Sequence, residues 1–272
     1  MSSRTYPARG VVLRSRALGE KDRVLVLLTE DQGKISASAR GARNPKSKLA
    51  ALAQPFTLAR FLIAKGRSLD IVSQAEIENA HTHLSGDLIK TAWASYFCEL
   101  CDAVPEQLPD PELFELLVVT MSTLDGAQNA ESAEIIGRWF EAKYLAHLGY
   151  APILGRCVAC EIKLHVAIDD TQQVVAFSPA LGGTLCGSCA FRDGAKLNVE
   201  VQSLRALRQL ERADAPPDSE LFRQQLSLST QARRDLRAVL QRSLSAHLEV
   251  KWKSRAFLDE VLASHDASES GV

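Results

Sequence analysis

Short apolar runs alternate with turn signals over residues 1–76, and this pattern predicts β-structure. In Gly10–Arg16, Val11 and Leu13 fall on one side and Arg14 and Arg16 on the other, as in a half-buried strand. Four further runs have the length and composition of strands, namely Val24–Thr29, Lys34–Arg40, Phe56–Ala64 and Leu69–Ala75. Five short strands in a segment of this size are typical of a small barrel, so we predict an OB-fold over residues 1–78.

The third of these strands carries polar residues on one side. Because side chains alternate along a strand, Ile35, Ala37 and Ala39 are predicted to face the core, while Lys34 and Arg40 face outward. The insertion that follows, residues 41–54, ends in Ala and Leu and is expected to hold a short helix.

From Glu78 the apolar spacing becomes that of helices. One helical face is marked by Ile89, Trp93, Phe97, Leu100 and Val104. Asp110 and Pro111 predict a helix start, with Asp as N-cap and Pro at the first position. Two more apolar stripes are expected to form helices, at residues 135–144, stopped by Gly149, and at residues 232–248.

These patterns together predict an α+β protein whose helical part is interrupted. We expect a helical domain over 79–155, a cysteine-bearing insertion over 156–192 and C-terminal helices over 193–266 that complete the helical domain. Residues 215–218, Ala-Pro-Pro-Asp, predict a break with a helix N-cap, and residues 267–272 predict a flexible polar tail.

Charge is distributed very unevenly along a chain whose formal net charge is only −1. Residues 1–70 carry 14 Lys or Arg and 5 Asp or Glu, whereas residues 71–155 carry 3 and 13. Between Gln32 and Leu69 there are eight bases and no acid. Clustered positive charge on an ordered segment suits a phosphate backbone, because binding releases condensed counterions. A chance fluctuation of charge, or a merely solvated surface, is the alternative.

We therefore predict nucleic-acid contacts by basic residues of the barrel strands and loops, namely Arg14, Arg16, Lys21, Arg23, Lys34, Arg40, Arg43, Lys46, Lys48, Lys65 and Arg67. The basic stretch contains only two aromatic residues, Phe56 and Phe61, and both are expected in the core. The expected contacts are thus to the phosphate backbone, with little base stacking and little sequence preference.

Four cysteines have the spacing of a metal site. Cys157-Val-Ala-Cys160 and Cys186-Gly-Ser-Cys189 form two C-x-x-C knuckles separated by 25 residues, a pattern that predicts one structural Zn²⁺ with four thiolate ligands. Free or redox-active thiols are the alternative, and disulfides are disfavoured in a cytosolic chain.

The other chemistry-bearing residues point to no reaction. Cys98-Glu-Leu-Cys101 is a third C-x-x-C, but it lies inside a strongly periodic helix, where small apolar packing is the main expectation and a redox or accessory metal role the alternative. The six histidines, including His81 and His83, are expected at surface or capping positions. No phosphate-binding loop, dinucleotide fingerprint, zinc-protease helix or nucleophile elbow is present, so we predict no enzyme.

The longest aliphatic run, Val24–Leu28, has five residues, which is too short to span a membrane. No apolar stretch of secretory type follows the first residues, so a cytoplasmic location is expected.

The sequence as a whole resembles the RecO family of bacterial recombination mediators. The resemblance rests on short motifs in order along the chain, among them Gly10-Val-Val-Leu-Arg-Ser-Arg16, Gly19-Glu-Lys-Asp-Arg-Val24, Gly33-Lys-Ile-Ser-Ala37, Ala39-Arg-Gly-Ala-Arg43, Pro45-Lys-Ser47, Gln54-Pro-Phe56, Lys65-Gly-Arg67, Ala94-Ser-Tyr96, Leu148-Gly-Tyr-Ala-Pro152, Phe177-Ser-Pro179, and Lys253-Ser-Arg255 before Phe257-Leu258. No single motif is diagnostic, but their order and spacing hold over nearly the full length.

The resemblance implies an N-terminal OB-fold, a central helical domain and an inserted zinc finger. It implies a non-enzymatic protein that binds single- and double-stranded DNA, anneals complementary strands and works with RecR in DNA repair and recombination. It further implies contact with the acidic C-terminal tail of the single-stranded DNA-binding protein, an indirect action on RecA, and a nucleoid-associated location. The alternative function is that of a protein-interaction adaptor whose barrel and zinc insertion dock onto a nucleic-acid-processing complex.

Overall fold

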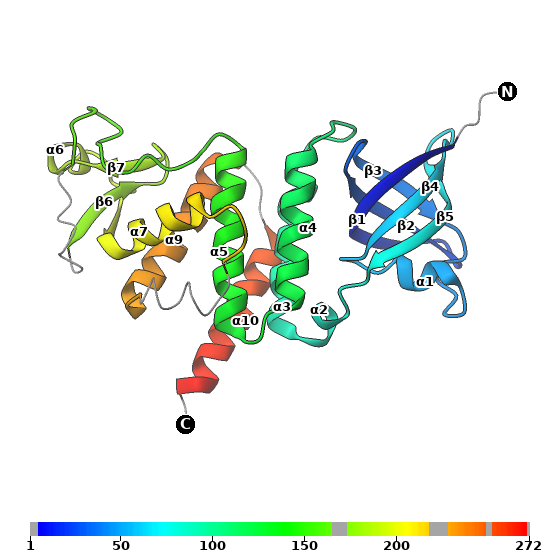
Figure 1. The fold of residues 1–272 in the computed structure, drawn as a ribbon. Helices are drawn as coiled ribbons and strands as arrows, with labels where there is room; N and C mark the ends of the chain where they lie inside the picture. The colour runs from blue at the N-terminus through cyan, green and yellow to red at the C-terminus, as the bar shows by residue number, and fades with distance from the viewer. Residues whose placement is uncertain (1–4, 165–172, 218–227, 249–251, 271–272) are drawn as a thin grey trace. The chain divides into compact units, whose positions relative to one another are not determined.

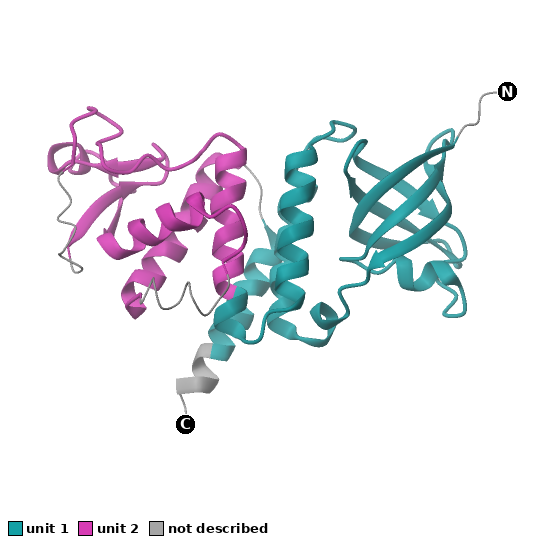
Figure 2. Cartoon of the chain, viewed as in Figure 1, with its two compact units in different colours: residues 1–133, 252–272 teal, residues 134–251 magenta. Residues whose placement is uncertain are grey.

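The computed structural model describes residues 5–164, 173–217, 228–248 and 252–270, and for residues 266–270 it describes the backbone alone (Figure 1). The chain forms two compact units, residues 1–133 with 252–272 (the first unit) and residues 134–251 (the second unit), coloured separately in Figure 2. This division cuts through the predicted helical domain, because the last helix belongs with the barrel. The four-part division at residues 78, 155 and 192 stays a prediction.

The first unit begins with a closed five-stranded barrel, as predicted (Figure 1). Its strands are β1 (Thr5–Leu18), β2 (Asp22–Thr29), β3 (Gly33–Ala39), β4 (Leu58–Ala64) and β5 (Asp70–Asn79), paired in the order β1-β2-β3-β5-β4. All pairs are antiparallel except β3 with β5, where Ala37 lies opposite Asp70. The short helix α1 (Lys48–Leu52) begins at the N-cap Ser47, and its Leu52 joins the barrel core, so the predicted helix in residues 41–54 is confirmed.

The predicted alternation of β1 is wrong at its centre. Val11, Val12 and Leu13 are all buried, and only Val12 belongs to the barrel core cluster. The register shifts between Val12 and Arg14, which marks a β-bulge. Leu13 and Arg14 therefore do not alternate as they would in a regular strand. Helix α3 packs on the outside of β1, so apolar residues are needed on both faces of this strand.

Helices complete the first unit. They are α2 (Thr82–Gly86), α3 (Leu88–Asp102), α4 (Pro111–Asp125) and α10 (Lys253–Ser270). Helix α4 starts where the sequence predicted, since the Asp110 carboxylate accepts the backbone N–H of Leu113 at 3.0 Å. Helix α10 packs against α3 although its residues come 150 positions later in the chain. Helix α10 runs to Ser270, and the flexibility predicted for residues 267–272 stays a prediction.

The second unit combines helices with a small sheet. It contains most of α5 (Ala130–His147), then β6 (Val174–Ser178), β7 (Gly183–Leu185), α6 (Gly187–Ala190), β8 (Leu197–Glu200), α7 (Val201–Arg212) and α9 (Thr230–His247). The helices predicted from the apolar stripes of α5 and α9 are confirmed, and β6 pairs antiparallel with β7. Asp218, the predicted N-cap in the 215–218 break, lies outside the described residues. Within the described part of the chain, no helix is both long and apolar enough to cross a membrane.

Candidate metal centre and nucleic-acid surface

The four predicted metal ligands come together in the second unit. The Sγ atoms of Cys157, Cys160, Cys186 and Cys189 all lie within 4.8 Å of one another. The Sγ atoms of Cys160 and Cys186 are 3.7 Å apart, close to the edge of roughly 3.8 Å that a tetrahedron with metal–sulfur bonds of about 2.3 Å would have. This donor set is complete and leaves no ligand position for water, so the four residues fit a structural metal and no catalytic one.

Backbone hydrogen bonds hold the two knuckles side by side. The N–H of Val158 donates to the carbonyl of Thr184 at 2.9 Å, which ties the first knuckle to strand β7, and α6 carries the second knuckle directly after that strand. Gly183 makes this approach possible, because a Cβ there would lie 2.4 Å from both the carbonyl oxygen of Ile153 and Cγ1 of Val158. The cluster therefore depends on one close backbone contact that only glycine allows.

The thiols of the cluster differ in their ionisation. Desolvation alone would raise the pKa of Cys157, but backbone hydrogen bonds from Cys186, Ala159 and Cys160 outweigh it and lower that pKa to about 6. Side-chain hydrogen bonds from Cys186 and Cys160 raise the pKa of Cys189 to about 12. A bound dication would stabilise all four cysteines as thiolates.

The third C-x-x-C is buried packing, as predicted. Cys98 is 3% exposed and Cys101 is fully buried in α3. Burial raises the pKa of both thiols, so neither is a ready nucleophile or ligand.

Two barrel loops bring several predicted DNA-binding residues together. The turn between β1 and β2 carries Lys21, and the loop after β3 carries Arg40 and Arg43, all exposed. The N–H of Arg43 donates to the carbonyl of Lys21 at 3.0 Å, and its guanidinium donates to the carbonyl of Gly19 at 2.5 Å. These bonds fix the two loops against each other, so their charges form one ordered surface.

The remaining predicted residues extend this surface to different degrees. Lys46 and Lys48 are exposed in the same loop and at the start of α1. Arg23 is half-buried and donates to Oγ of Ser15 at 3.1 Å. Lys65 and Arg67 are exposed in the β4–β5 loop, where Lys65 pairs with Asp70 at 3.1 Å. We call the exposed set Lys21, Arg40, Arg43, Lys46 and Lys48 the basic loop surface.

Lys34 lies on the predicted outer side of β3, but that side is covered by other parts of the first unit. Its side chain is only 12% exposed, its ammonium donates to the backbone carbonyl of Asp102, and it lies 3.4 Å from Oδ1 of that residue. The segment after α3 also pairs with β3 here, since Gln107 donates its N–H to the carbonyl of Lys34 at 2.9 Å. Arg14 stays 62% exposed but is paired too, with its Nε 2.6 Å from Oδ2 of Asp102.

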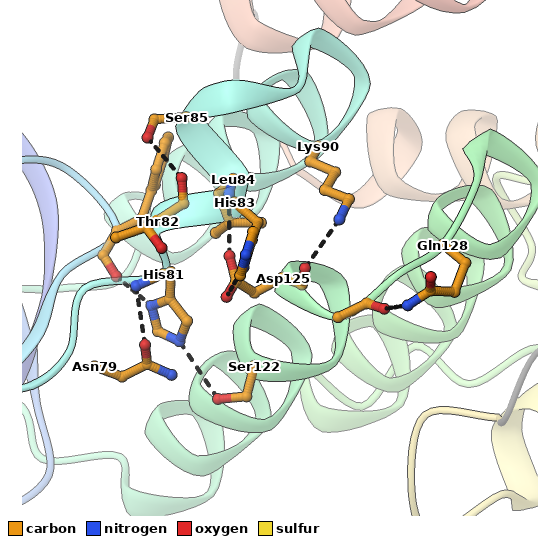
Figure 3. A network of polar contacts seen from close by, with 12 residues as sticks. Asn79, His81, Thr82, His83, Leu84, Ser85, Lys90, Ser122, Asp125 and Gln128 are labelled. Atoms are coloured by element: carbon orange, nitrogen blue, oxygen red, sulfur yellow. Dashed lines mark hydrogen bonds and ion pairs between the residues drawn. The ribbon is translucent and has the colours of Figure 1, made fainter.

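His81 stands at the N-cap of α2, one of the capping positions expected for the histidines, and it is buried. It is 2% exposed with a φ of 44°, and burial lowers its pKa below the ordinary value. Its Nδ1 donates to the carbonyl of Phe56 at 2.8 Å, which leaves Nε2 to accept the hydroxyl of Ser122 at 3.4 Å (Figure 3).

The neighbouring Asp125 anchors the start of α2 to the end of α4. It accepts the N–H of Leu84 at 3.0 Å and Nδ1 of His83 at 3.2 Å, and its carbonyl accepts the ammonium of Lys90 at 2.9 Å (Figure 3). His81 follows strand β5, and the residues around Asp125 come from α2, α3 and α4. This network therefore joins the barrel to the helices within the first unit. Its role is structural, and nothing in the spacing of His81 and His83 could have predicted it.

Two family models match almost the whole chain: "Recombination protein O N terminal" over residues 1–81 and "Recombination protein O C terminal" over residues 85–256. The chain belongs to the RecO family. The boundary between the two matches falls in the His81–Asp125 network, where the barrel ends and the helices begin.

Relatives named DNA repair protein RecO match over nearly their full length. The one from Symbiobacterium thermophilum is 35% identical over 260 residues, 93% of this chain and 96% of the relative. The one from Synechococcus elongatus is 35% identical over 273 residues, 98% of this chain and 99% of the relative. Membership of the RecO family places this chain among proteins of DNA repair and recombination.

Proposed function

We propose that the chain is a non-enzymatic DNA-binding recombination mediator. It binds single- and double-stranded DNA, anneals complementary strands and, with RecR, helps to load RecA onto DNA coated by the single-stranded DNA-binding protein, whose acidic tail it contacts. Its place of action is the cytoplasm, at the nucleoid. Membership of a DNA repair family supports this proposal, and the observation that carries it is the basic loop surface on the barrel.

The basic loop surface has the properties of a backbone-binding site. Its five cations are exposed, and the bonds of Arg43 to Lys21 and Gly19 hold the two loops in place before any ligand arrives. Ordered cations neutralise phosphates with little further loss of conformational freedom. Its lack of exposed aromatic residues favours binding that does not depend on base sequence.

The test is fluorescence anisotropy of a labelled oligo-dT across a salt series, together with annealing of complementary strands. Five phosphate contacts would give a slope of log affinity against log salt of roughly −3.5, from about −0.7 per contact. Replacing Lys21, Arg40, Arg43, Lys46 and Lys48 by Ala should make the slope shallower by roughly that amount and abolish annealing, with the circular dichroism spectrum unchanged. A wild-type protein that binds no DNA would refute the proposal.

For the metal centre we propose one structural Zn²⁺ held by Cys157, Cys160, Cys186 and Cys189. When bound, zinc would cross-link the two knuckles and so stabilise the module around β6 and β7. The protein's own contribution is the backbone contact at Gly183 that brings both knuckles to one point.

A protein-interaction adaptor is the second candidate, and one observation favours it. Phe191, two residues after Cys189, is 90% exposed, and Ile162, two residues after Cys160, is 58% exposed. Exposed apolar side chains beside a rigid metal knuckle suit a protein partner. Replacing both by Ser would weaken binding of RecR while oligo-dT binding stays intact if the module is such an adaptor surface.

A further inference from the structure

A groove of about 610 Å³ lies within the first unit, apart from the basic loop surface. Its walls come from β1 and β2, from the segment before β4, from α3 and from the first residues of α10. Leu13 and Phe56 supply apolar parts of the wall, and Arg14, Arg16 and Lys253 supply cations. The groove is therefore a mixed apolar and basic site and not a purely polar hollow.

Both carboxylates that line the groove are already bound within the protein. Glu99 caps helix α10, since its two oxygens accept the N–H groups of Lys253 at 3.1 Å and Ser254 at 2.8 Å. Asp102 accepts Arg14 at 2.6 Å and also holds Lys34. Asp102 is thus paired with cations, and both oxygens of Glu99 are occupied by hydrogen bonds.

Of the three cations that line the groove, Arg14 is paired with Asp102, whereas Arg16 and Lys253 have no carboxylate partner among the described residues. Both side chains are exposed, and no ion pair of either one is found among the described residues. Arg16 comes from β1 and Lys253 from the start of α10, and both line the groove. Two uncommitted cations facing one hollow attract an anion and not a neutral ligand.

The groove residue Arg16 lies two positions before the end of β1, and the turn that follows β1 carries Lys21 of the basic loop surface. Arg23 donates to Oγ of Ser15, which itself lines the groove, and Ala17, next to Arg16, lies opposite Arg23 in the β1–β2 ladder. Arg23 comes two residues after Lys21 of the basic loop surface. A strand lying on that surface would therefore reach the groove by following β1.

We propose that this groove binds one phosphate of single-stranded DNA through Arg16 and Lys253, with the attached sugar and base against Leu13 and Phe56. The proposal rests on the proposed DNA-binding function and extends its path from the barrel to helix α10. An acidic peptide has similar charge, but the short distance along the chain from Arg16 to the basic loop surface favours DNA.

The experiment measures anisotropy of labelled oligo-dT with the full chain over a salt series. The double variant Arg16→Ala, Lys253→Ala should bind more weakly at every salt concentration, and its slope of log affinity against log salt should be shallower by roughly 1.4, the contribution of two contacts. The matched control is Arg234→Ala, Arg242→Ala, which removes two exposed cations from α9 and should keep the wild-type slope. The exchange Arg16→Lys, Lys253→Arg keeps the charges and should restore the slope.

The other possible outcomes distinguish failure of the groove proposal from failure of the proposed function. A double variant with the wild-type slope, in a protein that binds DNA, would overturn the groove proposal and leave the proposed function standing. The same result with loss of binding to a labelled Asp- and Glu-rich hexapeptide would assign the groove to an acidic peptide instead. A wild-type protein without DNA binding would refute the proposed function itself.

Discussion

The ammonium of Lys34 lies 3.4 Å from Oδ1 of Asp102, a residue at the last position of helix α3. The pair joins strand β3 to a helix 68 residues further along the chain, and the two side chains are 12% and 17% exposed. Lys34 thus contributes to the attachment of helices to the barrel, and its charge is not offered to a ligand.

Lys34→Ala should therefore destabilise the protein and spare DNA binding. Removing a charged partner from a largely buried hydrogen bond lowers the free energy of unfolding by about 1–3 kcal/mol. Lys46→Ala should do the reverse: it changes stability by less than about 0.5 kcal/mol because the side chain is exposed, and it makes the salt slope shallower by roughly 0.7. Urea unfolding and oligo-dT anisotropy on both variants measure the contrast. If Lys34→Ala and Lys46→Ala changed the salt slope equally, Lys34 would also have to contact DNA.

The metal centre predicts about one zinc per chain, and a local response to its loss. Elemental analysis of purified protein gives the stoichiometry. After chelation, amide hydrogen exchange should rise in β6, β7 and α6 and stay unchanged in the barrel, because the cross-link is confined to that module. Cys186→Ala should lose the metal, whereas Cys98→Ala should retain it, since Cys98 is buried in α3. Metal-free protein with wild-type exchange in the module would contradict the assignment.

Two glycines near the cysteines should respond oppositely to Ala. Gly183→Ala places a Cβ 2.4 Å from the backbone oxygen of Ile153, so it should displace the first knuckle and speed the loss of zinc to a competing chelator. Gly187→Ala meets no atom within 4 Å and lies in α6, where Ala is the better helix former. It should release zinc at the wild-type rate or more slowly. Similar rates for the two variants would argue against the Gly183 contact.

Burial of His81 predicts a pH-dependent stability of the first unit. The folded protein lowers the pKa of His81, so below the ordinary pKa of about 6.5 the unfolded chain binds the additional proton. The contribution of His81 is thus full above that pH and decreases as the pH falls. His81→Asn, chosen because Asn tolerates a positive φ, should cost most at pH 7.5 and less at pH 5.5 in urea unfolding. A cost that is the same at both pH values would show that the pKa of His81 does not differ between the folded and unfolded chains.

Local patterns were sufficient for the barrel strands, for several helices and for the cysteine cluster. Two C-x-x-C spacings define four thiolates without knowledge of the rest of the chain, and an Asp-Pro pair is enough to place the start of α4. The five strands likewise follow from short apolar runs and turns, because each run carries its own period.

The errors concern what lies against an element. The alternation of β3 correctly placed Lys34 opposite Ile35, but no local pattern shows that Asp102 and the segment after α3 cover that side. The bulge after Val12 and the burial of His81 were not predictable for the same reason. Both depend on helices that pack onto the barrel from a distant part of the sequence. No local pattern predicts the groove between β1 and α10, because its walls come from distant parts of the sequence.

Helix α10 has a consequence for how the chain acquires its structure during synthesis. The ribosome makes β1 to α4 first, yet their unit is complete only when residues from Trp252 onward have emerged, because Glu99 and α3 bind the start of α10. The intervening 118 residues of the second unit, cysteine module included, are made in the meantime. The face of α3 that α10 covers is consequently exposed on the nascent chain for the longest time, and it is the surface on which a chaperone would act.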